Sequence, residues 1–257
     1  YYAPRSEELT VAPVTPVATE VMDALTNLVE PKSGRTADVW VGFTRGEESL
    51  TDVTVAWDPT TRLGADAAAR LEVERLGDDG APNGPAQSLP RRETATAPAT
   101  ARFALSPGKS TLRFTSYDAK DEVLDRWPED ISVPALAKAP LALATPRFLL
   151  ARSAFELRAL QTAPEATPAA SRRLRKTDRL LVEIEYYSAV GTPEVVTELL
   201  NQKGESLVTL PIPAAVDNKA RFEIPLQSLA PAVYVLHVSA RTADKHVEQH
   251  VPFRVVP

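Results

Sequence analysis

Proline is the sequence feature that most restricts how this chain can fold. The 257 residues contain 23 prolines and 10 glycines, and the prolines are spread along the whole length. Proline fixes the backbone φ angle and removes a hydrogen-bond donor, so it interrupts helices and the interior of sheets. Prolines distributed in this way divide a chain into short elements. We therefore expect an all-β protein without long helices.

Apolar and polar residues alternate between many of these prolines. The clearest examples are Val39, Val41 and Phe43 in one segment, and Val53, Val55 and Trp57 in the next. A period of two is typical of strands with one buried face. Short strands of this kind, repeated every 8 to 12 residues or so, predict immunoglobulin-like or fibronectin III-like β-sandwiches.

Landmarks recur in the same order in two parts of the chain. The tripeptide ARF occurs at residues 101–103 and 220–222, each time between a Gly-containing turn and a Pro-preceded apolar strand. Aligning the two parts places Phe103 on Phe222 and Val41 on Val182. We therefore predict a tandem duplication, with sandwich domains at residues 32–137 and 138–257.

Residues 1–31 differ from both predicted domains. Thr15 can cap a helix that has Pro16 in its first position, and apolar residues then recur at spacings of three and four up to Leu28. This pattern predicts a linker containing one short amphipathic helix that ends before Pro31.

The segment LAPAVY, residues 229–234, resembles the tyrosine corner of fibronectin-type and immunoglobulin-type sandwiches. In that motif a Tyr hydroxyl bonds back to the main chain at a sheet corner. A hairpin can also place Tyr234 after Pro231 without such a bond, so both interpretations stay open. Ser110 occupies the aligned position in the first part of the chain.

Charge and composition exclude several classes of function. The net charge is −5, and neither predicted domain has the strongly basic face that a nucleic acid requires. No apolar run approaches the roughly 20 residues of a membrane span. The chain has no cysteine, so neither a disulfide nor a cysteine-ligated metal is available.

No group of residues in the sequence indicates catalysis. Glu183 and Glu185 are two apart on a predicted strand and are interpreted as solubilising residues on its outer face. The basic run at residues 171–179 is interpreted as a solvated loop, and GDDGAPNG at residues 77–84 as a turn rather than a calcium loop. We expect a protein that is not an enzyme and has no cofactor.

The three histidines, His237, His246 and His250, all fall in the last predicted strands. His246, Glu248 and His250 would share one strand face, where a weak metal site is conceivable. A polar outer sheet face is the favoured interpretation, so no metal ligands are assigned.

The candidate interaction surface consists of Trp40, Leu181 and Tyr187. Trp40 and Leu181 are apolar residues at outward strand positions, which suits contact between domains or with a partner. The alternative function is a carbohydrate-binding module, which would need a strip of exposed aromatic residues. Its obvious candidates are Trp40, Trp57, Trp127, Tyr186 and Tyr187.

Several phrases resemble a family of exported von Willebrand A-related proteins common in Acidobacteria. They are YYAPR (residues 1–5), DALTNLVEP (23–31), TPRFLLARSAFELRAL (145–160), RLRKTDRLLVEIEYY (173–187) and LAPAVYVLHVSA (229–240). In that family a similar YYAP sequence closes the A domain, and β-rich modules follow it.

The resemblance implies a secreted or periplasmic accessory region with an upstream A-like domain as its partner. Another envelope or extracellular protein is a further expected partner. The family's adhesion motif, D-x-S-x-S, does not occur in these 257 residues, so no metal-ligand role transfers to them. Because the chain starts at Tyr1 rather than Met, we expect it to be part of a longer protein.

Overall fold

The computed structural model describes residue 21 and residues 34–61, 64, 67–91, 99–163 and 165–257. The helix predicted before Pro31 lies outside these residues, except for Val21. Val21 is helical and 2% exposed, and it packs against Leu200 and Val235 of the second sandwich.

In its described residues, the first sandwich contains seven antiparallel strands in two sheets. They are β1 (Ala37–Arg45), β2 (Thr51–Pro59), β3 (Arg70–Leu76), β4 (Gln87–Pro90), β5 (Ala101–Leu105), β6 (Gly108–Tyr117) and β7 (Val123–Val133). The sheets have the orders β1-β2-β5 and β4-β3-β6-β7. Between them lies a core that includes Val53, Leu71 and Phe114, all of them fully buried.

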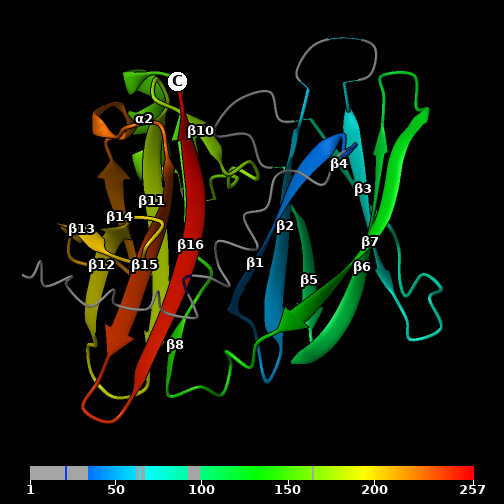
Figure 1. Cartoon of the computed structure of the whole chain (residues 1–257). Coiled ribbons are helices and arrows are strands. Elements are labelled where there is room, and N and C mark those ends of the chain that lie inside the picture. Colours follow the sequence, from blue (N-terminus) through cyan, green and yellow to red (C-terminus); the bar gives the residue numbers. More distant parts are fainter. Residues whose placement is uncertain (1–20, 22–33, 62–63, 65–66, 92–98, 164) are drawn as a thin grey trace, which may run out of the picture.

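The second sandwich repeats this plan with additions. Its elements are β8 (Leu141–Leu143), β9 (Arg147–Ala151), α2 (Ala154–Thr162), β10 (Arg173–Arg175), β11 (Arg179–Ser188), β12 (Glu194–Leu200), β13 (Ser206–Leu210), β14 (Lys219–Ile224), the 3-10 helix η1 (Leu226–Ser228), β15 (Val233–Arg241) and β16 (His246–Val256). One sheet has the order β14-β11-β8, with β9 also paired to β11, and the other has the order β10-β16-β15-β12-β13. Figure 1 shows the two sandwiches side by side, with β1 and β2 on the side of the first that faces the second. The expected all-β fold with two tandem sandwiches is confirmed.

Strand pairing supports the predicted duplication and corrects its alignment. The two ARF strands, β5 and β14, are equivalent edge strands. Phe103 pairs with Val53 of β2, and Phe222 pairs with Val182 of β11. The counterpart of Val182 is therefore Val53, and the alignment with Val41 is wrong. Because β1 and β2 share the same alternation, the sequence did not distinguish them.

The tyrosine corner forms in the second sandwich. The hydroxyl of Tyr234 donates a hydrogen bond of 2.9 Å to the backbone oxygen of Ala230. The Tyr234 ring also stacks on the core residue Phe253, with centroids 5.8 Å apart. In the first sandwich the aligned Ser110 has a buried hydroxyl without a hydrogen-bond partner. Among the described residues, the corner therefore forms at Tyr234 and not at Ser110.

The helix α2 lies between β9 and β10 of the second sandwich and was not predicted from the sequence. Ser153 caps the helix by accepting a hydrogen bond of 3.1 Å from the backbone N–H of Glu156. The Glu156 carboxylate accepts in turn from the backbone N–H of Arg152. The Ser-x-x-Glu spacing of a capping box is thus present in the sequence and would have predicted this helix.

Replacing Phe222 with Ala tests the second core. Phe222 is 6% exposed and packs among the buried residues of the second sandwich. We expect Phe222→Ala to lower the free energy of unfolding by about 3–5 kcal/mol, measured by urea denaturation, because it leaves a cavity. The control is Leu207→Ala, whose side chain is 52% exposed. A loss below about 1 kcal/mol for Phe222→Ala would place this residue outside the core.

Candidate functional site

Trp40, the first candidate interaction residue, lies in the junction between the two sandwiches. It sits on the outer face of β1, is 6% exposed and packs with Ala56 and with Ala170 of the second sandwich. Its ring lies across Gly42, where an added Cβ would be only 2.0 Å from the Trp40 ring. Glycine at position 42 therefore leaves the space that the indole occupies.

Tyr187, the second candidate, closes the same junction at the free edge of β1. Its hydroxyl accepts a hydrogen bond of 3.0 Å from the backbone N–H of Arg45 and donates one of 2.8 Å to Glu185. The Arg45 guanidinium lies 4.5 Å from the centre of the Tyr187 ring. Burial raises the pKa of Tyr187 above its usual value. The hydroxyl thus remains a neutral hydrogen-bonding group.

Two further backbone groups of β1 are paired with the second sandwich. The N–H of Phe43 donates to the hydroxyl of Thr145, and the N–H of Thr145 donates to the oxygen of Phe43, both at 3.0 Å. Thr145 lies in the short break between β8 and β9. Unpaired backbone groups at a sheet edge can pair with strands of other chains. This contact therefore also prevents such pairing along part of β1.

Charged groups complete the junction. One oxygen of Asp58, in β2, accepts hydrogen bonds from the backbone N–H groups of Ala170 at 2.8 Å and Ser171 at 3.4 Å. Burial lowers the pKa of the nearby Arg172 guanidinium to about 10, and the charge of Asp58 opposes this shift. Arg172 also lies 4.3 Å from the centre of the Phe148 ring. The two sandwiches therefore carry interacting opposite charges, Asp58 and Arg172, at their junction.

The basic run at residues 171–179 was expected to be a solvated loop, and the structure corrects this. The Arg172 guanidinium is buried, and Arg173–Arg175 form β10, which pairs in parallel with β16. The segment Gly77–Gly84 does form the expected turn, since Gly80 and Gly84 have positive φ angles of 76° and 111°. Glycine adopts such angles without strain.

Leu181, the third candidate, lies beneath α2. It is 2% exposed and packs with Leu149, Leu157 and Leu160. All three residues predicted as an interaction surface are therefore buried within the chain. Trp40 and Tyr187 make contacts between the domains, and Leu181 makes a contact within the second domain.

Glu183 was interpreted as a solubilising residue, and this is wrong. Its side chain is 1% exposed. It is held by Arg147, whose Nη1 lies 2.8 Å from Oε1, and by Arg221, whose Nε lies 2.6 Å from Oε2. Arg221 also donates to the backbone oxygens of Leu160 and Ala163 at the end of α2. This ionic cluster fastens the helix to β11.

The aromatic residues proposed for carbohydrate binding do not form an exposed strip. Their exposed fractions range from 3% for Trp57 to 9% for Tyr186 and Tyr187, with Trp40 and Trp127 between these values. A sugar-binding strip would need several of these rings on the surface. The carbohydrate alternative therefore lacks the residues on which it depended.

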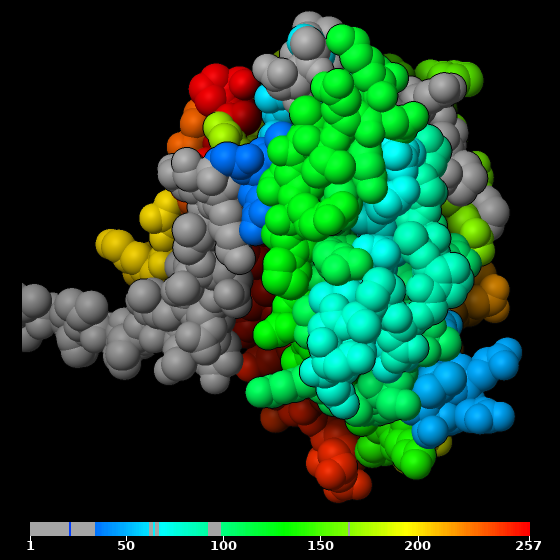
Figure 2. All heavy atoms as spheres, turned by 90° about the vertical axis from the view of Figure 1, so that its right-hand side faces the viewer, coloured from blue at the N-terminus to red at the C-terminus, as the bar shows by residue number. Residues whose placement is uncertain are grey.

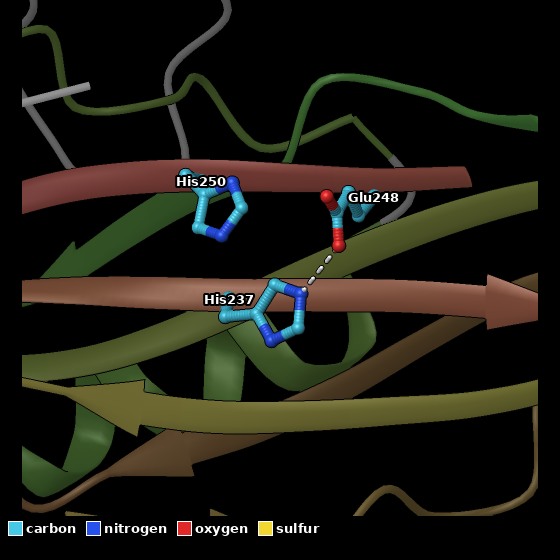
Figure 3. Close-up of side chains that lie close together, drawn as sticks. All are labelled: His237, Glu248 and His250. Atoms are coloured by element: carbon cyan, nitrogen blue, oxygen red, sulfur yellow. Dashed lines mark hydrogen bonds and ion pairs between the residues drawn. The ribbon is translucent and has the colours of Figure 1, made fainter. Parts of the chain in front are cut away.

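A cluster of titratable side chains lies on the outer face of the five-stranded sheet. His237 of β15 is directly opposite His250 of β16, and their rings stack with centroids 4.7 Å apart. Glu248 lies on the same strand face as His250, and its Oε2 is 3.2 Å from Nε2 of His237 (Figure 3). On the other side, Nδ1 of His237 is 3.3 Å from a carboxylate oxygen of Glu198.

The sequence grouped a different set of residues at this place. His246, Glu248 and His250 do share a face of β16, but His246 pairs with Arg241 at the end of the strand. The antiparallel register brings in His237 instead. The nearest ligand atoms of His237, Glu248 and His250 all lie within 4.8 Å of one another.

Comparisons with known proteins give distant similarities only. No family model and no curated protein matches the chain. A tetra-tandem repeat from the extending region of a large adhesion protein is 8% identical over 86% of this chain, with a TM-score of 0.24. The chain covers 49% of that structure, which is about half its length.

Two other solved structures are similar at the same level. Fibronectin III-like modules of Clostridium thermocellum CbhA are 13% identical, with a TM-score of 0.23, over 84% of this chain and 91% of theirs. A DUF4785 family protein from Legionella pneumophila is 13% identical, with a TM-score of 0.29, over 85% of this chain and 64% of its own. Function is therefore inferred from the residues of this chain itself.

Within the described residues, no helix has the length and apolarity needed to cross a membrane.

Replacing Glu183 with Gln tests the ionic cluster under α2. The substitution keeps the size of the side chain but leaves two cations around a buried neutral group, so we expect a loss of about 3–5 kcal/mol in the free energy of unfolding. The control is Glu223→Gln, which affects an exposed pair with Arg179 at 3.6 Å and should cost less than about 1 kcal/mol. Equal effects of the two substitutions in urea denaturation would contradict a structural role for Glu183.

Asp38, beside the junction, predicts a pH dependence. Burial raises its pKa above the usual 3.8, and neighbouring Asp58 adds to the shift, while the Ser171 hydroxyl and Arg173 oppose it. Because the folded value is raised, the stability that this group contributes is present at acidic pH and is lost as the pH rises through the folded value. We expect Asp38→Asn to raise the melting temperature at pH 7, with a gain that disappears towards pH 3. A lower melting temperature at pH 7 would show that the charged carboxylate is favourable.

Proposed function

We propose that this chain is a non-catalytic, extracytoplasmic pair of β-sandwiches that acts as a rigid spacer or protein-interaction region of a larger von Willebrand A-related protein. The observation that carries the proposal is the junction. The outer face and free edge of β1 are both covered by the second sandwich, through Trp40, Phe43 and Arg45.

Rigidity follows from the kinds of contact at this junction. Domains joined only by a linker are expected to move relative to each other unless their interface is large and hydrophobic. Here the interface combines apolar packing with directional hydrogen bonds to Phe43, Arg45 and Asp58. Arg45 also donates to the backbone oxygens of Leu136 and Ala139 in the segment that connects the sandwiches. Any rotation would break several of these bonds together.

A spacer also requires outer surfaces that stay hydrated and do not associate with one another. The outer face of β3, β6 and β7 points away from the second sandwich and is shown in Figure 2. It carries ion pairs, including Arg113 of β6 with Glu74 of the neighbouring β3 at 2.8 Å, and Arg70 with Glu72 within β3. The phenolic hydroxyl of Tyr117 donates to Glu72 at 2.7 Å. This charged face suits a hydrated surface or a polar contact with another envelope protein.

The location outside the cytoplasm and the upstream A-like domain rest on the sequence resemblance. Residues 1–5 and the phrases at 145–160, 173–187 and 229–240 carry it. Much of the last three phrases forms β9, α2, β11 and β15, which build the second core and its helix cover. The proposal therefore treats them as the framework of an accessory module.

Spin-label distance measurements test the rigid spacer. The chain has no cysteine, so the exposed residues Lys120 and Lys203 can be replaced by Cys and labelled, one in each sandwich. We expect a single narrow distance distribution by pulsed electron paramagnetic resonance. Asp58→Asn should broaden it, because it removes the negative charge that stabilises the buried Arg172 cation.

The matched control is Asp78→Asn, in the exposed turn between β3 and β4, which should leave the distribution narrow. A broad distribution in the protein without the Asp58 substitution would contradict a rigid spacer. A narrow distribution that Asp58→Asn leaves unchanged would show that Asp58 does not hold the junction.

A further inference from the structure

We propose that His237, Glu248 and His250 form a binding site for a divalent transition metal ion, with Zn²⁺ as the best-fitting ion. Two imidazoles and one carboxylate are the ligand types that Zn²⁺ binds in sites with three protein ligands. Hard cations such as Mg²⁺ and Ca²⁺ prefer oxygen ligands alone.

The spacing of two ligand atoms fits a shared metal ion. Zn²⁺ lies about 2.0–2.2 Å from nitrogen and carboxylate oxygen, so two ligands at a tetrahedral angle are about 3.3–3.6 Å apart. Nε2 of His237 and Oε2 of Glu248 are 3.2 Å apart. The ligand atoms of all three residues lie within 4.8 Å of one another, and a rotation of the His250 ring, which now stacks on His237, would direct its nitrogen to the same ion.

Glu198 supplies the outer contact that a metal-binding histidine usually has. A ligating His donates its second ring N–H to a carboxylate or carbonyl group, which fixes the tautomer. Glu198 lies 3.3 Å from Nδ1 of His237, on the side away from Glu248. With its proton on Nδ1, the imidazole presents the lone pair of Nε2 to the Glu248 carboxylate. A metal ion placed between these two acceptor atoms would satisfy both of them.

The sheet holds these residues in place before any ion binds. His237, Glu198 and His250 lie on three adjacent strands, because Glu198 and His250 are the direct cross-strand neighbours of His237. The side chain of His237 is 16% exposed, whereas that of Glu248 is 37% exposed. The nitrogen ligand is therefore partly shielded, and the remaining coordination position faces solvent. Water or a group from a partner would occupy it.

Zinc titration of the complete 257-residue chain tests the site. After treatment with a chelator, the protein is titrated with ZnCl₂ at pH 7.5 by isothermal calorimetry, and the affinity is checked by competition with a chromogenic zinc chelator. We expect one Zn²⁺ per chain. His237→Ala, His250→Ala and Glu248→Gln should each weaken binding at least tenfold, and Glu198→Gln should weaken it about 10- to 100-fold.

His246→Ala is the matched control, because His246 is exposed on the same face of β16 and lies outside the cluster. It should leave the affinity unchanged. Circular dichroism establishes that each variant is folded. In NMR spectra, Zn²⁺ should shift the imidazole Cε1–H signals of His237 and His250 and leave that of His246 in place.

Three results would overturn the proposal. The first is no stoichiometric binding, which would leave His237 with its contacts to Glu198 and Glu248 alone. The second is an equal loss of affinity in His246→Ala and His237→Ala, which would indicate adventitious binding to surface histidines. The third is binding that His237→Ala and His250→Ala leave intact.

Discussion

The covered edge of β1 is the constraint on which the arrangement of the two sandwiches depends. A three-stranded sheet leaves the outer strand with free backbone groups and an uncovered face. Here Thr145 and Tyr187 bond the free edge, while Trp40 fills the space above Gly42 against Ala170. The second sandwich thus pairs the edge backbone groups of β1 and also covers its outer face. The relative position of the two sandwiches therefore depends on where the first sandwich places β1.

The outer face of β11 shows how one strand can serve three purposes. Leu181 lies under α2, Glu183 holds two arginines, and Tyr187 reaches the junction. These residues alternate with the core residues Val182, Ile184 and Tyr186. A strand buried on both faces has a nearly continuous apolar sequence, and the interior of β11, LLVEIEYY, has one apart from two glutamates. The buried position of Glu183 therefore depends on arginines far away in sequence.

The sequence predicted the fold well and the environment of single residues poorly. Alternation and proline spacing indicated two sandwiches, and LAPAVY indicated the bond that Tyr234 makes to Ala230. The same alternation did not distinguish β1 from β2, because both strands present identical patterns to their core. Exposure of Trp40, Leu181 and Tyr187 depended on which elements cover each outer face. That is a tertiary property, and a period of two carries no information about it.

The histidine cluster illustrates the same limit at a site. Spacing along one strand could group His246 with Glu248 and His250, but the distance from His237 to His250 depends on the pairing of β15 with β16. The hairpin of residues 242–245 fixes the register of β15 and β16. The length of this hairpin therefore determines which two histidines are opposite each other. A shift of one residue would move His237 or His250 to the opposite face of the sheet. The turn thus sets the geometry of the proposed metal site, because it fixes the strand register that brings the ligands together.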